Sequence, residues 1–458
     1  MTTLTQTKTL DPVTLQVNQQ SEEVHSGNVQ DVLRKYMLVD GFDVTVDLNK
    51  STGSYIHDAK TGKRYLDFFT YVASHPLGMN HPKLDNEQFI REIGKVAVNK
   101  PSLSDIYTEV QAEFVSKFFE IAVPSYFKYS FFIEGGALAV ENALKVAFDW
   151  KVRKNFEKGY KEEKGHQVIH FRQAFHGRSG YTMSLTNTDP TKVMYYPKFD
   201  WPRIDNPKVT FPLNDENLAA VIKAEEAAVE QIMNALAQNK DDIACIILEP
   251  IQGEGGDNHF RKEFFQTLRK LCDENEMLLI FDEVQTGIAM TGKWWAHMHY
   301  VQPDIISFGK KTQVCGILST GRVDDIDENV FRKPSRINST WGGNMVDMKR
   351  FTKILEIIDE ENLVDNCALN GQYLLDSIYG LINKYPDKLS NGRGLGLFCA
   401  FDCKDTEMRN KVTANAMNSG LLILGSGEKS MRFRPAVNIT KGEIDEGMEI
   451  LDKVINGV

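Results

Sequence analysis

Leu278-Leu279-Ile280-Phe281-Asp282 is the stretch of sequence that decides the fold. Four consecutive apolar residues that end in an acid predict a strand buried on both faces, with Asp282 at its carboxyl end. A carboxylate that has lost water stays charged only beside a cation, so a positive partner is expected nearby. Lys310 follows the next apolar run, 305–308. It is either an ordinary surface lysine or an amine able to form a Schiff base with an aldehyde cofactor.

Short apolar runs alternate with helical patterns between residues 129 and 308. Strands are expected at 129–133, 167–171, 243–248, 278–281 and 305–308, with helices at 137–152, 217–238 and 262–275. This alternation predicts an α/β fold with a mostly parallel sheet sandwiched by helices. The C-terminal part combines expected helices at 348–360, 368–384 and 441–456 with strands at 397–402 and 431–434, which predicts a smaller α+β domain. Ligands of parallel sheets bind at the carboxyl ends of the strands, where Asp282 falls.

Composition narrows the class of protein. The 458 residues are 42% hydrophobic and 25% charged, as in globular chains, and their net charge of −10 disfavours nucleic acid as a partner. No apolar run has the length of a membrane span, so we expect a soluble protein without a membrane partner. The six cysteines form no CxxC pair, which predicts reduced thiols in a cytoplasmic location and no metal site.

Several polar or glycine-rich segments follow the expected strands. Glu134-Gly135-Gly136-Ala137 opens a helix, where free backbone N–H groups bind phosphate, but an ordinary turn fits it equally well. In Phe175-His176-Gly177-Arg178 an aromatic ring can stack on a flat ligand and Arg178 can pair with a carboxylate, although a lone loop arginine is usually a surface residue. Asp282 and Lys310 together provide what pyridoxal phosphate (PLP) needs, an acid for its ring nitrogen and a Schiff-base amine.

The order and spacing of these segments resemble the class III (omega) aminotransferases, PLP enzymes of fold type I. The resemblance covers roughly Asp67 to the C-terminus, in GGALAVENALK, HFRQAFHGRSGYTMSLT, ILEPIQGEGG, FDEVQTG, PDIISFGKKTQVCG and NSTWGGN, and these strings look most like those of the lysine 6-aminotransferases. It implies a large PLP-binding domain at 76–345. It also implies a small domain at 346–458 that includes the N-terminal segment 26–75. The polar, Thr- and Gln-rich composition of residues 1–25 predicts a flexible tail there.

The same resemblance assigns the cofactor residues. Lys310 is the implied Schiff-base lysine, with Lys311 as its competitor, and Asp282 pairs with the ring nitrogen. The remaining cofactor contacts are Gln285 near the ring 3-oxygen, Gly136 and Ala137 at the phosphate, Phe175 against the ring, and Thr340 at the phosphate of the other subunit. Because Thr340 would act across subunits, the resemblance implies a homodimer with its active site at the interface.

For the substrates, Arg178 and Asn338 look like the carboxylate-binding residues, and Glu254 with Arg432 looks like a switch pair. The implied reaction moves the terminal amine of L-lysine to 2-oxoglutarate. Ornithine or 4-aminobutyrate as the donor, a PLP mutase or decarboxylase, and a nucleotide-dependent dehydrogenase or scaffold are the alternatives, the dehydrogenase being disfavoured by the missing GxGxxG.

Two segments depart from the family pattern. Ala289 and Met290 replace a Gly and an Arg, and Gly135-Gly136-Ala137 lacks the hydroxyl of the usual Ser-Gly-Ser/Thr.

Overall fold

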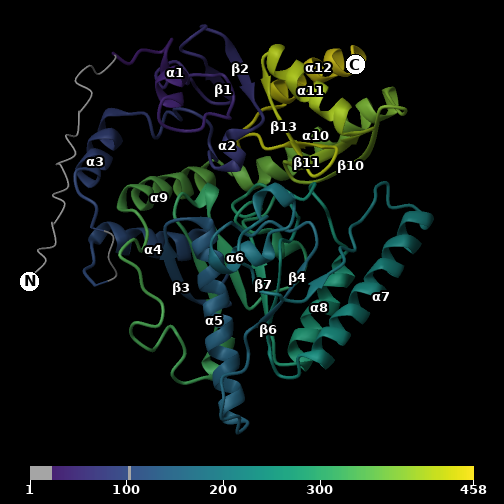
Figure 1. Cartoon of the computed structure of the whole chain (residues 1–458). Coiled ribbons are helices and arrows are strands. Elements are labelled where there is room, and N and C mark those ends of the chain that lie inside the picture. The colour runs from purple at the N-terminus through teal and green to yellow at the C-terminus, as the bar shows by residue number, and fades with distance from the viewer. Residues whose placement is uncertain (1–22, 102–104) are drawn as a thin grey trace, which may run out of the picture.

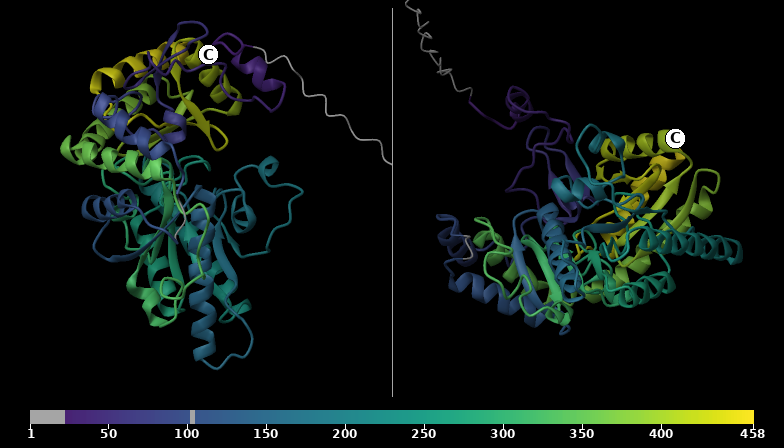
Figure 2. Two further views of the ribbon diagram at one scale, coloured as in Figure 1. Left: turned by 90° about the vertical axis from the view of Figure 1, so that its left-hand side faces the viewer. Right: turned by 60° about the horizontal axis from the view of Figure 1, so that its bottom comes forward.

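The computed structural model describes residues 23–101 and 105–458, and most of the expected 1–25 tail lies outside them. Figure 1 shows a large lower part built on a central sheet and a smaller upper part in which purple N-terminal and yellow C-terminal segments lie side by side. The two further views in Figure 2 keep this arrangement. The α/β fold with a smaller α+β region is therefore confirmed, whereas the exact domain boundaries stay predictions.

The central sheet has seven strands in the order β3-β9-β8-β7-β6-β4-β5. β9 runs antiparallel to both of its neighbours, β3 and β8, and the pairs from β8 to β5 are parallel. The bounds are β3 Phe127–Ile133, β4 Gln167–Phe171, β5 Arg203–Ile204, β6 Ile243–Leu248, β7 Leu278–Asp282, β8 Ile305–Phe308 and β9 Cys315–Thr320. The five predicted strands are thus present, while β5 and β9 were not predicted.

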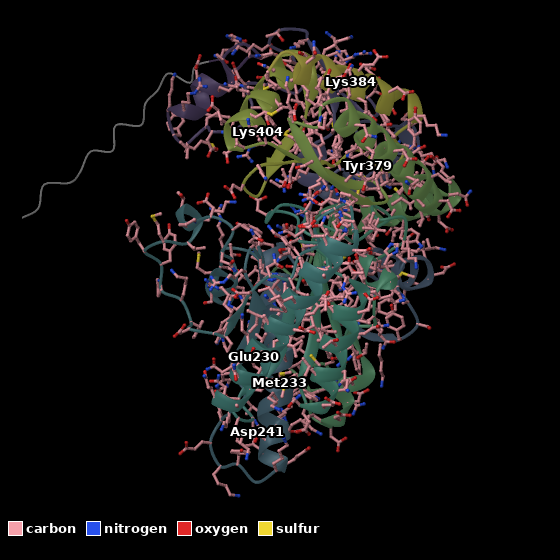
Figure 3. All side chains as sticks on the ribbon, turned by 90° about the vertical axis from the view of Figure 1, so that its right-hand side faces the viewer. Glu230, Met233, Asp241, Tyr379, Lys384 and Lys404 are labelled. Atoms are coloured by element: carbon pink, nitrogen blue, oxygen red, sulfur yellow. The ribbon has the colours of Figure 1, made fainter. Side chains whose placement is uncertain are left out.

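Helices cover both faces of this sheet, which explains why its strands are continuously apolar. Along β7, Leu278 and Ile280 pack with the inner side of α5, Gly136–Glu157. Leu279 and Phe281 point to the opposite face and join the core that includes α8, Lys262–Glu274. The other helices of the large part are α3 Glu87–Ala97, α4 Glu109–Ile121, α6 Gly180–Leu185, α7 Asp215–Gln238 and α9 Met345–Glu360. In the stick view of Figure 3, the labelled Glu230 and Met233 mark α7 at the lower part.

The smaller part combines one antiparallel and one mixed sheet with several helices. One sheet has the order β10-β11-β14-β13, and the other, β1-β2-β12, joins the N-terminal segment to the C-terminal chain. Figure 3 labels Tyr379 and Lys384 on α10 and Lys404 after β11 in this upper part. The bounds are α1 Val29–Arg34, β1 Tyr55–His57, β2 Arg64–Asp67, α10 Leu363–Lys384, β10 Leu389–Leu395, β11 Phe398–Cys403, α11 Thr406–Asn418, β12 Leu421–Leu422, β13 Leu424–Ser426, β14 Ser430–Phe433 and α12 Lys441–Asn456.

A left-handed turn, α2 at Thr70–Ala73, connects the N-terminal segment to the large part. Its four residues have φ between 40° and 63°, so it is not an ordinary right-handed helix. Asp67 holds the turn by accepting hydrogen bonds from the backbone N–H groups of Phe69 and Thr70, both at 2.8 Å. Immediately after the turn, the Ser74 carbonyl accepts a hydrogen bond of 2.8 Å from the Gln313 side chain, three residues beyond Lys310.

Candidate active site

Asp282 ends β7 with its side chain buried, as the sequence predicted. One carboxylate oxygen accepts a hydrogen bond from the Val284 backbone at 3.0 Å, and the other pairs with His176 Nδ1 at 2.8 Å. His176 follows β4, two strands away; the sequence analysis named its segment but did not pair His176 with Asp282. Its position after a predicted strand could have indicated it, because parallel strands bring the residues that follow their carboxyl ends to one edge of the sheet.

Glu249 directly follows the intervening strand β6 and is also buried. Its carboxylate accepts hydrogen bonds from the backbone N–H groups of Phe175, at 2.9 Å, and Gly253, at 3.0 Å. Burial raises the pKa of Glu249 to about 7, Asp282 adds to the increase, and His176 opposes it. Three ionisable groups therefore meet where β4, β6 and β7 end.

Lys310 follows β8 and opens a short 3₁₀ turn with φ of 53°, a left-handed conformation that is uncommon outside glycine. Burial lowers the pKa of its amine to about 8, and the nearby guanidinium groups of Arg432 and Arg434 lower it further, while Glu254 and Asp282 act in the opposite direction. An amine of this kind is a better nucleophile near neutral pH than an ordinary lysine.

Lys311, the competitor for the same role, is fully buried and already has a structural partner. Its ammonium donates a hydrogen bond of 2.6 Å to the Gln285 carbonyl. Burial, followed by repulsion from Lys310 and Arg434, lowers its pKa well below the usual range. The geometry therefore favours Lys310 as the reactive amine.

Gly135 and Gly136 form the predicted turn between β3 and α5. Gly135 has φ of 102°, and no side chain caps the helix, so its first N–H groups remain available to an anion. Val284 and Gly177 pack closely against this turn. A Cβ on Gly136 would lie 3.1 Å from the Val284 side chain, and one on Gly177 would lie 2.5 Å from Cβ of Ala137. The glycines thus allow the loops after β4 and β7 to pack against the turn.

Gln285 is oriented by a buried arginine that sequence reasoning did not assign. Its amide oxygen accepts hydrogen bonds from Arg434 Nε and Nη2, at 3.0 and 2.9 Å. Because arginine can only donate, the amide oxygen must face it, and the NH₂ group of Gln285 stays a donor for a ligand. Arg434 is itself fixed by a bidentate ion pair with Asp257, at 2.7 and 2.9 Å, and by the Phe398 ring, 3.4 Å from its guanidinium carbon.

Glu254 and Arg432, which the family resemblance implies are a switch pair, lie together. Glu254 Oε2 is 3.0 Å from Arg432 Nη1, and the Arg432 side chain is 6% exposed. Lys192, which the sequence did not indicate, donates a hydrogen bond of 2.6 Å to the other carboxylate oxygen. Burial raises the pKa of Glu254, but Arg432 and Lys192 outweigh it and bring the pKa below its ordinary value.

The other predicted residues lie around these groups. Phe175 is half-buried, with the Lys192 ammonium 5.4 Å from its ring centre. Arg178 is exposed, and its guanidinium has no ion pair or hydrogen bond within residues 23–101 and 105–458. Asn338 and Thr340 are exposed in the loop before α9, which passes the phosphate turn where the Glu134 N–H donates to the Trp341 carbonyl at 3.2 Å.

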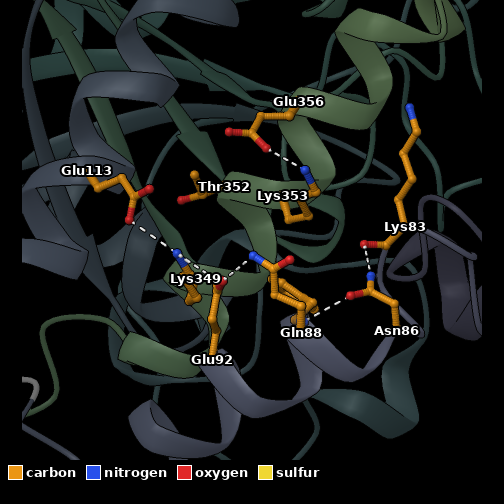
Figure 4. A pocket seen from close by; sticks show the side chains of 10 residues that line it. Lys83, Asn86, Gln88, Glu92, Glu113, Lys349, Thr352, Lys353 and Glu356 are labelled. Carbon is orange, nitrogen blue, oxygen red and sulfur yellow. Dashed lines mark hydrogen bonds and ion pairs between the residues drawn. The ribbon is translucent and has the colours of Figure 1, made fainter.

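A separate surface cavity of about 390 Å³ lies between α3, α4 and α9 (Figure 4). Its charged groups are ion-paired, with the Lys349 ammonium 3.5 Å from Glu92 and 3.3 Å from Glu113. None of the predicted site residues lines it. We therefore place the chemistry at the strand ends and not in this cavity.

Comparison with known proteins agrees with this geometry. Residues 37–455 match the family Aminotransferase class-III. The chain belongs to the class III aminotransferases. It is 50% identical over 419 residues to the L-lysine-epsilon aminotransferase of Mycobacterium tuberculosis, covering 91% of this chain and 93% of the relative. The Streptomyces clavuligerus enzyme of the same name is 45% identical over 438 residues, 95% of each chain.

A solved structure of lysine aminotransferase from M. tuberculosis superimposes with a TM-score of 0.93 at 47% identity, covering 95% of this chain and all of the other. The fold is therefore that of the PLP-dependent aminotransferases of fold type I, and the cofactor of this family is PLP.

The residues present fit that cofactor. A helix start without a side-chain cap suits its phosphate, a buried carboxylate suits its protonated ring nitrogen, and a buried amine with a lowered pKa suits its aldehyde. Where the family Gly and Arg are replaced, Ala289 adopts φ of 62° and Met290 is buried, so that loop keeps a glycine-like backbone and an apolar contact. No helix within the described residues is long and apolar enough to cross a membrane.

Proposed function

We propose that this class III aminotransferase transfers the ε-amine of L-lysine to 2-oxoglutarate. The products would be L-glutamate and 2-aminoadipate 6-semialdehyde, which closes to piperideine-6-carboxylate. The observation that carries the proposal is the Glu254–Arg432 pair, because a removable carboxylate on a buried arginine lets one site accept two differently shaped substrates. The names of the relatives at 45–50% identity support lysine as the donor.

PLP, when bound, supplies an aldehyde and an electron-withdrawing ring. Lys310 would hold it covalently and, once displaced by the substrate amine, would carry a proton between the substrate carbon and the cofactor carbon. Asp282, fixed by His176, would accept a hydrogen bond from the ring nitrogen and keep that nitrogen protonated. Gln285 would donate to the ring oxygen through its free NH₂ group.

Other residues would hold the cofactor in place. The uncapped N–H groups at Gly136 and Ala137 would bind the phosphate, and Phe175 would lie against the ring. Thr340 of the partner subunit would complete the phosphate site. The exposure of Thr340 in this chain supports such a role and with it a homodimer.

Lysine and glutamate differ in where their carboxylates lie. Lysine presents a methylene beside its reacting carbon and a distant carboxylate, which Arg178 and Asn338 would bind. Its methylene chain would leave Arg432 buried and unpaired, at a cost of about 3–5 kcal/mol, unless Glu254 stays in contact. Glutamate and 2-oxoglutarate carry a carboxylate beside the reacting carbon, and this group would replace Glu254 on Arg432.

A cytoplasmic location stays a prediction. The six cysteines, none of them in a disulfide, support it.

Chain length is the property that site chemistry defines least. One methylene discriminates by about 1–3 kcal/mol, so ornithine and 4-aminobutyrate are the competing donors. The test is mass spectrometry of the products formed by the PLP-loaded enzyme from each of the three donors, with and without 2-oxoglutarate. We expect lysine to give glutamate, and the cyclic imine in excess of the enzyme, only when 2-oxoglutarate is present, because without it the reaction stops after one equivalent of imine per active site. A lysine product formed in excess of the enzyme without 2-oxoglutarate would indicate a mutase or decarboxylase, and preferred turnover of another donor would replace lysine as the proposed donor.

A further inference from the structure

The carboxylate of Glu254 lies between two cations that come from separate elements. Arg432 belongs to β14, and Lys192 ends a short 3₁₀ turn at Pro190–Lys192. Each cation contacts a different oxygen, Oε2 at 3.0 Å for Arg432 and Oε1 at 2.6 Å for Lys192. The proposed switch uses only the first contact, so the role of the second needs its own explanation.

The backbone around Glu254 is fixed, which confines any movement to its side chain. The Glu254 carbonyl accepts a hydrogen bond from the Gly427 N–H at 3.0 Å. On either side the glycines are closely packed. A Cβ on Gly253 would lie 2.3 Å from the Gln285 amide oxygen, and one on Gly255 would lie 2.0 Å from the Gln173 carbonyl. A carboxylate that leaves Arg432 must therefore find its next partner within reach of one glutamate side chain.

The two cations differ in burial and in the quality of their contact. Arg432 is 6% exposed, and within the described chain its Nε and Nη1 have no partner with good hydrogen-bond geometry, although Nη1 lies at ion-pair distance from Glu254. Lys192 is 26% exposed and makes a full hydrogen bond to the carboxylate. Arg432 would thus gain from an incoming carboxylate, whereas Lys192 already holds the oxygen that has to move with Glu254.

We infer that Lys192 is the second docking position of the Glu254 carboxylate, the one that keeps it paired when a substrate carboxylate takes its place on Arg432. The inference rests on the proposed switch. Lys192 touches the switch and not the reacting atoms, so it is a positioning residue that determines how well dicarboxylates compete with lysine.

Loss of the Lys192 charge should therefore affect one class of substrate. Without Lys192, Glu254 would have Arg432 as its remaining close cation, and its displacement would leave a partly buried carboxylate unpaired. Dicarboxylate affinity should fall about tenfold, the scale of one hydrogen bond to a charged group. When lysine binds, Glu254 stays on Arg432. The affinity of the variant for lysine should therefore stay within about twofold of that of the wild type.

The test compares Lys192→Met with the wild type, both loaded with PLP. Calorimetry measures the Kd of glutarate, an unreactive dicarboxylate, and single-turnover absorbance measures half-saturation by glutamate and by lysine. Lys192→Arg keeps the cation and should behave like the wild type, and Lys192→Gln should reproduce the loss. Lys198→Met is the matched control, because Lys198 lies on the same segment but donates to the carbonyls of Val193 and Tyr196.

The expected result is weaker glutarate and glutamate binding in both neutral variants, with lysine unchanged. Equal losses for glutamate and lysine, or an unchanged glutarate Kd, would overturn the inference. The binding of glutarate and glutamate does not depend on which amine donor the enzyme uses. A wild-type enzyme that does not react with lysine would therefore refute the proposed donor but leave this test valid.

Discussion

Lys310 is held in a backbone conformation that lysine seldom adopts. A non-glycine residue at φ of 53° costs about 1–3 kcal/mol and persists only when its surroundings enforce it. Here Gln313 donates to the Lys310 carbonyl from its backbone at 2.8 Å, and its side chain is anchored on Ser74. Such enforced strain is typical of active sites, and Lys310 follows β8 at the sheet edge where Asp282 lies, close enough for Asp282 to affect its pKa.

The lowered pKa of Lys310 leads to a pH prediction for the cofactor-free protein. Since the pKa is about 8 instead of 10.5, the reactive neutral amine should become the major form above pH 8. Covalent capture of PLP, trapped with borohydride and quantified by mass spectrometry, should rise through pH 8 and level off above it. PLP capture that keeps increasing towards pH 10, or trapping that persists in Lys310→Ala, would contradict the assignment of Lys310 as the reactive amine.

Replacing the switch carboxylate should separate the two half-reactions. Glu254→Gln leaves Arg432 without a counter-charge when lysine binds, so lysine single-turnover efficiency should fall about tenfold while that of glutamate falls less. Glu225→Gln is the control for losing an ion pair, because it breaks the partly buried Glu225–Arg261 pair, whose atoms are 2.6 Å apart and lie away from the site. Equal losses with both donors would exclude the switch.

At the scale of the elements, the buried strands could be predicted from the sequence because burial on both faces requires continuous hydrophobic runs. β6, β7 and β8 were therefore predicted to within a residue, and the acids that end β7 and follow β6 and the lysine that follows β8 were located with them. β9 was missed because Gly316, Ser319 and Thr320 interrupt its apolar character, although neighbouring strands bury it. Propensity is a weak guide where tertiary packing decides.

The site was predictable where one segment carries it and unpredictable where distant segments meet. Asp282 and Lys310 each follow a recognisable strand. The contacts Lys192–Glu254, His176–Asp282 and Arg434–Gln285 join residues 62, 106 and 149 positions apart, and no local pattern in the sequence indicates them. Their discovery required the sheet order and the position of β14.

The loop after β4 provides a prediction about an element. Gly177 has φ of 118°, and an added Cβ would lie 2.5 Å from the Ala137 Cβ at the phosphate turn. Gly177→Ala should displace that turn and weaken PLP binding about tenfold or more, roughly 1.4 kcal/mol, as measured by equilibrium reconstitution. Gly159→Ala is the matched control, because Gly159 has φ of 96° but open space around it. It should lower stability by about 1 kcal/mol and leave PLP affinity unchanged.

For the whole molecule, the N-terminal and C-terminal segments share one sheet through β2 and β12, and the left-handed turn at Thr70–Ala73 ties them to the Lys310 turn. Movement of the smaller part against the larger would therefore be transmitted to the site. The proposed homodimer adds Thr340 of the partner subunit to the same place.

Mixing two inactive variants tests that dimer. If Thr340 acts across subunits, refolding Lys310→Ala together with Thr340→Ala should create mixed dimers with one intact site each. Random pairing would then restore about a quarter of the wild-type sites. The measurement is activity after co-refolding, compared with each variant refolded alone. Activity no higher than the sum of the separate variants would place Thr340 in its own subunit's site.

The most direct test of the central claim follows the transferred nitrogen. L-lysine carrying a heavy-nitrogen label at either the ε-amine or the α-amine is mixed with 2-oxoglutarate and the PLP-loaded enzyme, and glutamate is analysed by mass spectrometry. We predict labelled glutamate from the ε-labelled lysine alone, with the cyclic imine keeping the α-nitrogen. Labelled glutamate from the α-labelled lysine, or no glutamate at all, would contradict the proposed reaction.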